Sequence, residues 1–256
     1  MSSVNAILLD AGGVMIFPSP ELLLPPLRAA GLDPSPADLQ RAHYWAMAVC
    51  DEPGREAPGA GWWREYLRDC VLALGVPETA ADDVAGQIVS LTDGFGWTHV
   101  GPGVPDALRG LAALGLPIGI VSNSTGEVEN VLRRLDVCYA PARSEADGCR
   151  GVEVGVVIDS AVVGVSKPDP RIFGLALDAL GVPSASSDTV IHVGDSLRYD
   201  VTGAIAAGLR PVHLDPYGFC PAPDGHEHLR RLDELPDLIA GRLPPAETRH
   251  RRPPGT

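Results

Sequence analysis

Four polar residues with catalytic potential lie at the ends of apolar runs or at helix starts: Asp10, Ser122, Lys167 and Asp195. Asp10 ends the apolar run 6–9 and is followed by two glycines. Such a short run is typical of a strand buried on both faces. Its last residue lies at the carboxyl end of the strand, where open parallel sheets bind their ligands. Asp10 is therefore a candidate nucleophile.

A second group of acidic residues predicts a cation site. Gly194-Asp195 ends another apolar run, and Asp200 follows five residues later at the start of a helix. Two carboxylates on one rim repel each other unless a cation lies between them. Ser122 alone would indicate only a turn residue, and Lys167 alone would indicate only a surface charge. The prediction of a site therefore depends on the occurrence of these polar residues together.

Strands alternate with short helices, which predicts an α/β fold with a doubly wound, Rossmann-like parallel sheet. The expected strands are 6–9, 117–121, 154–158, 190–193 and 211–214, and the expected helices are 104–114, 124–135, 168–180 and 200–207. Ser124 and Glu127 fit a capping box at the start of the second of these helices. We expect residues 139–151 to form a surface loop.

Residues 18–96 interrupt this alternation with an inserted helical module. Its helices are expected at 37–50, 62–74 and 80–91, with a Pro/Gly-rich loop at 53–61. The predicted domains are therefore an α/β core (1–17 plus 97–241), an α-helical cap (18–96) and a disordered tail (242–256). The run His226-Glu227-His228 follows a Pro/Gly loop and is expected to lie on the surface without metal.

Composition limits the classes of partner. The 256 residues carry a formal net charge of −13, which argues against binding to nucleic acid or to an anionic membrane. The N-terminus has no basic region and no long apolar segment. Five cysteines, odd in number and without C-x-x-C spacing, fit reduced thiols. We expect a cytoplasmic monomer or homodimer that binds a small molecule.

Together these residues resemble the haloacid dehalogenase-like hydrolase superfamily, in the subfamily with a helical cap inserted after the first motif. The resemblance covers about residues 4–17 and 97–215. Four motifs carry it, in the expected order: Leu-Asp-Ala-Gly-Gly-Val at 9–14, Ile-Val-Ser-Asn-Ser at 120–124, Lys167 within Val-Ser-Lys-Pro-Asp-Pro, and His-Val-Gly-Asp-Ser-Leu-Arg-Tyr-Asp at 192–200.

The resemblance implies a Mg²⁺-dependent phosphatase for a small phosphorylated metabolite. Asp10 would attack the substrate and form an aspartyl-phosphate. Ser122 and the following backbone amides, beginning with Asn123, would hold the phosphoryl oxygens. Lys167 would offset the negative charge that the nucleophile shares with the phosphoryl group, which makes it both catalytic and substrate-binding.

The resemblance also implies the metal ligands. Asp195 and Asp10 would bind Mg²⁺ together with the backbone carbonyl of residue 12, two positions after the nucleophile. Asp200 would lie beside the metal and hold either its waters or Lys167. Oxygen ligands of this kind suit Mg²⁺.

Gly12 departs from the pattern, because the phosphatases of the family have an aspartate there as general acid and base. Such catalysis is commonly worth ~10²–10⁴-fold in rate. Glycine keeps the backbone carbonyl for the metal and loses the proton shuttle.

Three interpretations follow from Gly12. The first is a phosphatase for a substrate with a good leaving group, or one that takes its acid from the cap, with His43 or Tyr44 as candidates against the plainer alternative of a packed helix face. The second is a catalytically weak binding or regulatory protein. The third is a metal-independent dehalogenase using a cap arginine (Arg41, Arg55 or Arg64), which the intact acidic motif disfavours.

Overall fold

The chain forms two compact units. The computed structural model describes residues 4–52, 54, 62–92, 95–141, 148–183, 188–222 and 225–242. The contacts divide the described residues into a core unit, within 4–16, 100–216 and 225–242, and a helical unit, within 17–99 and 217–222. In the described part of the chain, no helix has the length and apolarity that a membrane crossing requires.

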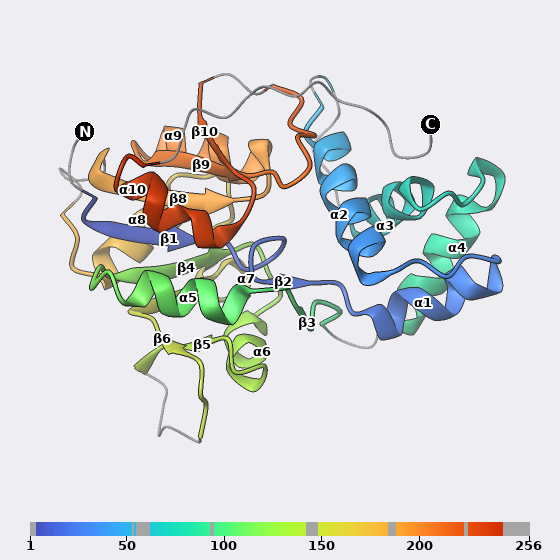
Figure 1. The fold of residues 1–256 in the computed structure, drawn as a ribbon, viewed down its shortest axis with the longest axis horizontal. Helices are drawn as coiled ribbons and strands as arrows, with labels where there is room; N and C mark the ends of the chain where they lie inside the picture. Colours follow the sequence, from blue (N-terminus) through green and yellow to red (C-terminus); the bar gives the residue numbers. More distant parts are fainter. Residues whose placement is uncertain are drawn as a thin grey trace. The chain divides into compact units, whose positions relative to one another are not determined.

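A six-stranded parallel sheet forms the centre of the core unit (Figure 1). Its order is β10-β9-β8-β1-β4-β7, and each adjacent pair is parallel. The strands are β1 (Ala6–Leu9), β4 (Ile118–Ser122), β7 (Val156–Asp159), β8 (Val190–Gly194), β9 (Arg210–Leu214) and β10 (Glu227–Leu229). The predicted α/β class is therefore confirmed, since β1 is central and the chain winds outward on both sides of it.

Helices cover both faces of this sheet. In Figure 1, α5 (Val104–Ala112) and α10 (Leu235–Ile239) lie on the nearer face and α8 (Arg171–Ala179) lies behind the sheet. Buried side chains of α8 pack with Leu8 of β1, Val121 of β4 and Ala204 of α9 (Thr202–Ala206) in one apolar cluster. This packing holds the strands rigidly, so the carboxyl ends of the strands keep constant positions relative to one another.

Residues 160–163 and 197–201 form short helical segments directly after strands. They are α7 (Ser160–Val163), after β7, and the π-helical turn η3 (Leu197–Val201), which precedes α9. The smaller elements of the core unit are β5 (Cys138–Tyr139), β6 (Val152–Glu153) and η4 (Leu232–Glu234). The predicted loop at 139–151 lies partly outside the described residues, as does the tail from 243 onward.

The helical unit contains α1 (Pro20–Ala29), α2 (Pro36–Cys50), α3 (Trp62–Ala73) and α4 (Glu78–Leu91). They share an apolar core that includes Leu27, Tyr66 and Ile88, each with no exposed surface. Most of the predicted loop at 53–61 lies outside the described residues. The chain passes between the units through β2 (Ile16–Phe17) and β3 (His99–Val100), which form a two-stranded sheet.

Two local predictions were wrong. The capping box at Ser124 does not form: α6 (Val128–Arg134) begins later, and Glu127 makes no side-chain capping hydrogen bond. Instead, the amides of Gly126 and Val128 donate to Oδ2 of Asp159, at 2.9 and 3.3 Å. A buried carboxylate from the neighbouring strand thus satisfies the helix N-terminus in place of a local hydroxyl.

The second error concerns residues 226–228. They were expected on the surface, but Glu227–Leu229 is the sheet strand β10, paired in parallel with β9. His226 and His228 are half-buried. The reason is tertiary: β9 presents an unpaired edge that a short segment with polar residues can complete.

Candidate active site

Lys167 connects the ends of two strands of the sheet. Its Nζ lies 2.8 Å from Oδ2 of Asp10, just after β1, and 2.7 Å from Oδ1 of Asp200, in the π-helical turn after β8. Lys167 is 2% exposed, and it is the only lysine in a chain that otherwise uses arginine. A compact ammonium fits between two carboxylates where a planar guanidinium would not.

The side chain of Asn123 holds the backbone of Lys167 in place. Its Oδ1 accepts from the amide of Lys167 (2.8 Å), and its Nδ2 donates to the carbonyl of the same residue (3.0 Å). Ser122 is buried at the end of β4, opposite Asp159 in the sheet register. The predicted phosphoryl-binding segment therefore also positions the lysine.

His192 is a further residue of the site. It lies within the fourth motif, but no role was predicted for it from the sequence. Its Nε2 lies 2.8 Å from Oδ1 of Asp200, and its ring packs edge-on against Phe173. The Ser196 amide donates to Oδ2 of Asp200 at 3.2 Å. A Cβ atom at Gly194 would overlap the Asp200 carboxyl group, so glycine is required there. The sequence did contain one indication of this role, because His192 is a histidine within an otherwise apolar strand.

The carboxylates of the site differ in their affinity for protons. Burial raises the pKa of Asp10 to about 6 against the opposing charge of Lys167, and burial with the charge of Asp200 raises the pKa of Asp195 to about 8. Burial alone would also raise the pKa of Asp200, but the charge of Lys167 and the hydrogen bond from His192 lower it. Asp200 is therefore the permanently ionised partner of Lys167.

A divalent cation fits this set of donors. Asp10, Asp195 and Asp200 are buried, and one carboxylate oxygen from each lies within 4.8 Å of the others. Three carboxylates face the single ammonium of Lys167, which leaves two negative charges unbalanced when all four groups are ionised. Carboxylate oxygens with a backbone carbonyl nearby are ligands that suit Mg²⁺.

Added Mg²⁺ is expected to raise the melting temperature more at pH 8 than at pH 5. An acid whose pKa is higher in the folded chain binds protons more tightly there than when unfolded. Stability without metal therefore falls as the pH rises from the ordinary value of 3.8 through about 6 for Asp10 and about 8 for Asp195. Mg²⁺ binds the ionised carboxylates, so it offsets this loss mainly at the higher pH.

Thermal unfolding in Mg²⁺ and in EDTA at the two pH values measures this difference. The variant Asp195→Asn serves as the matched control and should lose most of the shift. Equal shifts at pH 5 and pH 8 would contradict the assignment of these acids as cation ligands.

Gly12 lies in the turn after Asp10 and forms an isolated bridge with Ile16. Gly13 has a φ of 67°, in the left-handed region that favours glycine, whereas Gly12 is not among the glycines with positive φ. The backbone at position 12 is therefore compatible with a side chain.

The candidate acids of the cap are built into its packing. His43 is 2% exposed, and its Nδ1 lies 2.8 Å from the hydroxyl of Tyr66. The rings of Phe17, Tyr44 and Trp97 contact it edge-on. These contacts support the interpretation of His43 and Tyr44 as a packed helix face.

Two of the three arginines considered for dehalogenation have contacts within the helical unit. Arg41 stacks over the rings of Tyr217 and Phe219, and Arg64 donates to the backbone carbonyl of Asp82 at 3.1 Å. Arg55 lies outside the described residues.

Comparisons with known proteins agree with this fold. The family model of haloacid dehalogenase-like hydrolases matches residues 4–208. "Haloacid dehalogenase-like hydrolase domain-containing protein 3" of Danio rerio is 30% identical over 228 residues, covering 81% of this chain and 83% of the relative. A probable phosphoglycolate phosphatase of Pseudomonas putida is 27% identical over 223 residues, covering 82% and 75%.

The fold is also similar to that of a solved 2-haloacid dehalogenase from Pseudomonas syringae. The TM-score is 0.51 at 21% identity, covering 94% of this chain and all of the other. Identity at this level shows the fold alone. The match of the family model over most of the chain shows more: the protein belongs to the haloacid dehalogenase-like hydrolases.

Proposed function

We propose that this hydrolase is a Mg²⁺-dependent phosphatase, which cleaves a small phosphorylated metabolite through an aspartyl-phosphate on Asp10. The observation that carries this is the set of three buried carboxylates beside one ammonium, which leaves two negative charges unbalanced once Asp10 and Asp195 have lost their protons. A divalent cation balances the two remaining charges. A metal-independent dehalogenase would have no cation to balance this excess of negative charge. Phosphatases among the relatives support the same choice.

The first step would be attack by a carboxylate oxygen of Asp10 on the substrate phosphorus. The bond from phosphorus to the leaving oxygen breaks, and that oxygen departs with the electron pair. The ammonium of Lys167, 2.8 Å from Oδ2 of Asp10, offsets the negative charge where the two anions meet. Mg²⁺, when bound, would add positive charge at the phosphoryl oxygens.

The second step would return the enzyme to its starting state. Water attacks the phosphorus of the aspartyl-phosphate, the bond to Asp10 breaks, and inorganic phosphate leaves. Gly12 offers no proton donor in the first step and no proton acceptor in the second. We therefore propose substrates whose leaving oxygen is weakly basic, such as acyl or aryl phosphates.

Purified protein is expected to release phosphate from p-nitrophenyl phosphate with Mg²⁺ and to lose this activity in EDTA. Asp10→Asn should reduce release to background because the nucleophile is gone. Asp106→Asn is a matched control, since this acid is exposed on α5 of the same unit. The same assays with 2-chloropropionate measure halide release.

Two other results would overturn the proposal. Halide release that is insensitive to EDTA would identify a dehalogenase. Turnover of neither substrate, together with a melting temperature raised by inorganic phosphate, would identify a binding protein that retains the fold.

The proposal includes the setting in which the enzyme works. The net charge of −13 favours a small-molecule substrate over nucleic acid or an anionic membrane surface. The odd count of five cysteines fits the reducing cytoplasm. We propose that the enzyme acts there as a monomer or homodimer.

A further inference from the structure

Three histidines of the core unit gather at β9 and β10, next to the segment that carries Asp195. His213 of β9 and His228 of β10 are direct partners in the parallel register. His226 precedes His228 by two residues, and side chains two apart point to the same face of an extended segment. The ring centroids are 5.5 Å apart for His213 and His226, 5.4 Å for His213 and His228, and 4.5 Å for His226 and His228.

Hydrogen bonding determines which nitrogen of His213 is available. Its Nε2 lies 3.1 Å from the backbone carbonyl of Asp195, and a carbonyl only accepts, so Nε2 carries the proton. Nδ1 is then the nitrogen with the lone pair. It is buried, and among the described residues it has no hydrogen-bond partner. A side chain that is 4% exposed therefore presents an unsatisfied acceptor.

His228 contributes a second buried ring nitrogen. Its Nε2 is buried and also has no hydrogen-bond partner within the described part of the chain. Burial lowers the pKa of His228, which favours the neutral imidazole. A cation bound to the lone pair of Nδ1 of His213 and to a ring nitrogen of His228 would satisfy both buried rings.

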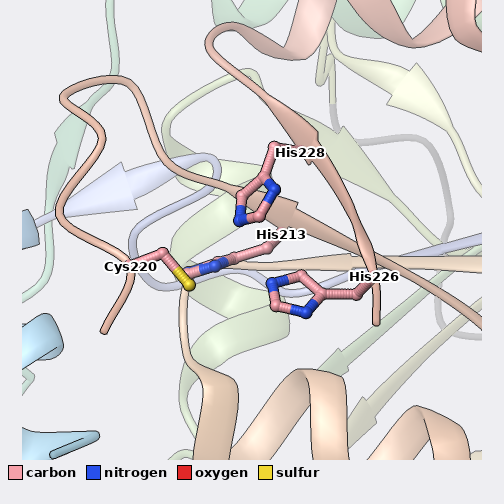
Figure 2. A group of neighbouring side chains, drawn as sticks. All are labelled: His213, Cys220, His226 and His228. Atoms are coloured by element: carbon pink, nitrogen blue, oxygen red, sulfur yellow. The ribbon is translucent and has the colours of Figure 1, made fainter. Parts of the chain in front are cut away.

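We propose that His213, His226 and His228 form a binding site for a transition-metal ion, with Zn²⁺ as the best fit. Figure 2 shows the rings of His213, His226 and His228 gathered together. One nitrogen from each ring lies within 4.8 Å of the others. Tetrahedral zinc with bonds of about 2.0–2.1 Å needs ligand nitrogens about 3.4 Å apart, a spacing that small ring rotations reach.

The chemistry of the ligands distinguishes this site from the acidic one. Imidazole nitrogens select zinc, copper or nickel, whereas Mg²⁺ prefers carboxylate and carbonyl oxygens. Cys220 belongs to the segment 217–223, which is grouped with the helical unit, so the proposal rests on the three histidines alone. Three ligands leave one coordination position open.

The proposed site has a direct connection to the phosphatase machinery. The Nε2–H of His213 donates to the carbonyl of Asp195, and metal-bound histidines commonly donate their second nitrogen in this way. A metal on Nδ1 would fix the orientation of the ring and the tautomer. His213 would then act as a positioning residue for the loop that carries Asp195.

The test is a Zn²⁺ titration of the full chain, without a histidine tag and after treatment with EDTA. With millimolar Mg²⁺ present to occupy the acidic site, calorimetry should show one equivalent of Zn²⁺ bound. His226→Gln and His228→Gln should each weaken binding by more than about 100-fold, since even second-shell changes commonly cost 10–100-fold. His99→Gln, a histidine outside the cluster, is the matched control and should leave binding unchanged.

Melting temperatures without metal show whether each variant is folded, so misfolding is distinguishable from loss of a ligand. Absence of Zn²⁺ binding by the folded wild type would overturn the proposal. So would Zn²⁺ binding that Mg²⁺ displaces and that both histidine variants retain, because the zinc would then occupy the acids. Neither result bears on the phosphatase proposal, which is tested by phosphate release.

Discussion

Replacement of Lys167 by methionine is expected to lower the free energy of unfolding by about 3–5 kcal/mol, because removing one partner of a buried ion pair leaves the other charges uncompensated. For a chain of this size, this corresponds to a fall of roughly 6–20 °C in melting temperature. Nζ of Lys167 contacts both Asp10 and Asp200, so one substitution exposes two carboxylates to their mutual repulsion. Phosphate release should fall to background, since the charge beside the nucleophile is lost.

The loss of stability should depend on pH in a defined direction. In the wild type, Lys167 helps to hold the pKa of Asp200 below its ordinary value, so this contribution is present above pH about 4 and is lost only in stronger acid. Without the lysine, the pKa of Asp200 rises, because burial is then opposed only by His192. The variant then loses stability as the pH rises, and the difference from wild type should be larger at pH 8 than at pH 5.

Thermal unfolding of both proteins in EDTA measures this difference without a contribution from metal. Lys167→Arg tests whether charge alone is sufficient, and we expect it not to rescue phosphate release. Arg171→Met is the matched control, because this cation is exposed and paired with Asp169 on the surface. A difference between wild type and Lys167→Met that is the same at both pH values would contradict the role given to Asp200.

The positions of the site residues at strand ends could be predicted because each strand is a short apolar run that is followed directly by polar residues or glycine. In the 190–193 run, the change from apolar residues to Gly194-Asp195 marks the carboxyl end of β8. In a parallel sheet all such ends meet at one edge. The grouping of Asp10 with Asp195 and Asp200 therefore required only the order of the motifs, and the structure brings all three together.

What the sequence analysis missed depends on contacts between distant segments. The hydrogen bonds between the Asn123 side chain and the Lys167 backbone join residues 44 positions apart. Asp159 caps a helix that begins 31 residues earlier in the sequence. Neither contact has a local pattern. Strand β10 has no apolar alternation either, since it forms only because β9 offers a partner. The histidine cluster follows from that pairing, so no spacing in the sequence could indicate it.

Gly12→Asp is expected to raise the rate of phosphate release from alkyl phosphates by about 10²–10⁴-fold, the usual contribution of a general acid and base. An alkoxide is a poor leaving group, so its departure depends on a proton that Gly12 cannot supply. The backbone at position 12 is outside the left-handed region, so its φ does not disfavour a residue with a side chain. The new carboxyl group would be two residues from Asp10, in the turn that follows β1.

The gain should depend on the leaving group. For p-nitrophenyl phosphate the departing oxygen is already stable as an anion, so the gain should be much smaller than for an alkyl ester. Rates for a series of phosphate esters, plotted against the pKa of the leaving alcohol or phenol, should fall steeply for the wild type and less steeply for the variant.

Gly12→Asn is the matched control, because it adds a side chain of the same size that cannot serve as a general acid or base. Its rates should follow the steep dependence of the wild type. If Gly12→Asp gave the same slope as Gly12→Asn in folded protein, proton transfer would not limit this enzyme. The preference for weakly basic leaving groups that we assign to Gly12 would then have to come from another part of the site.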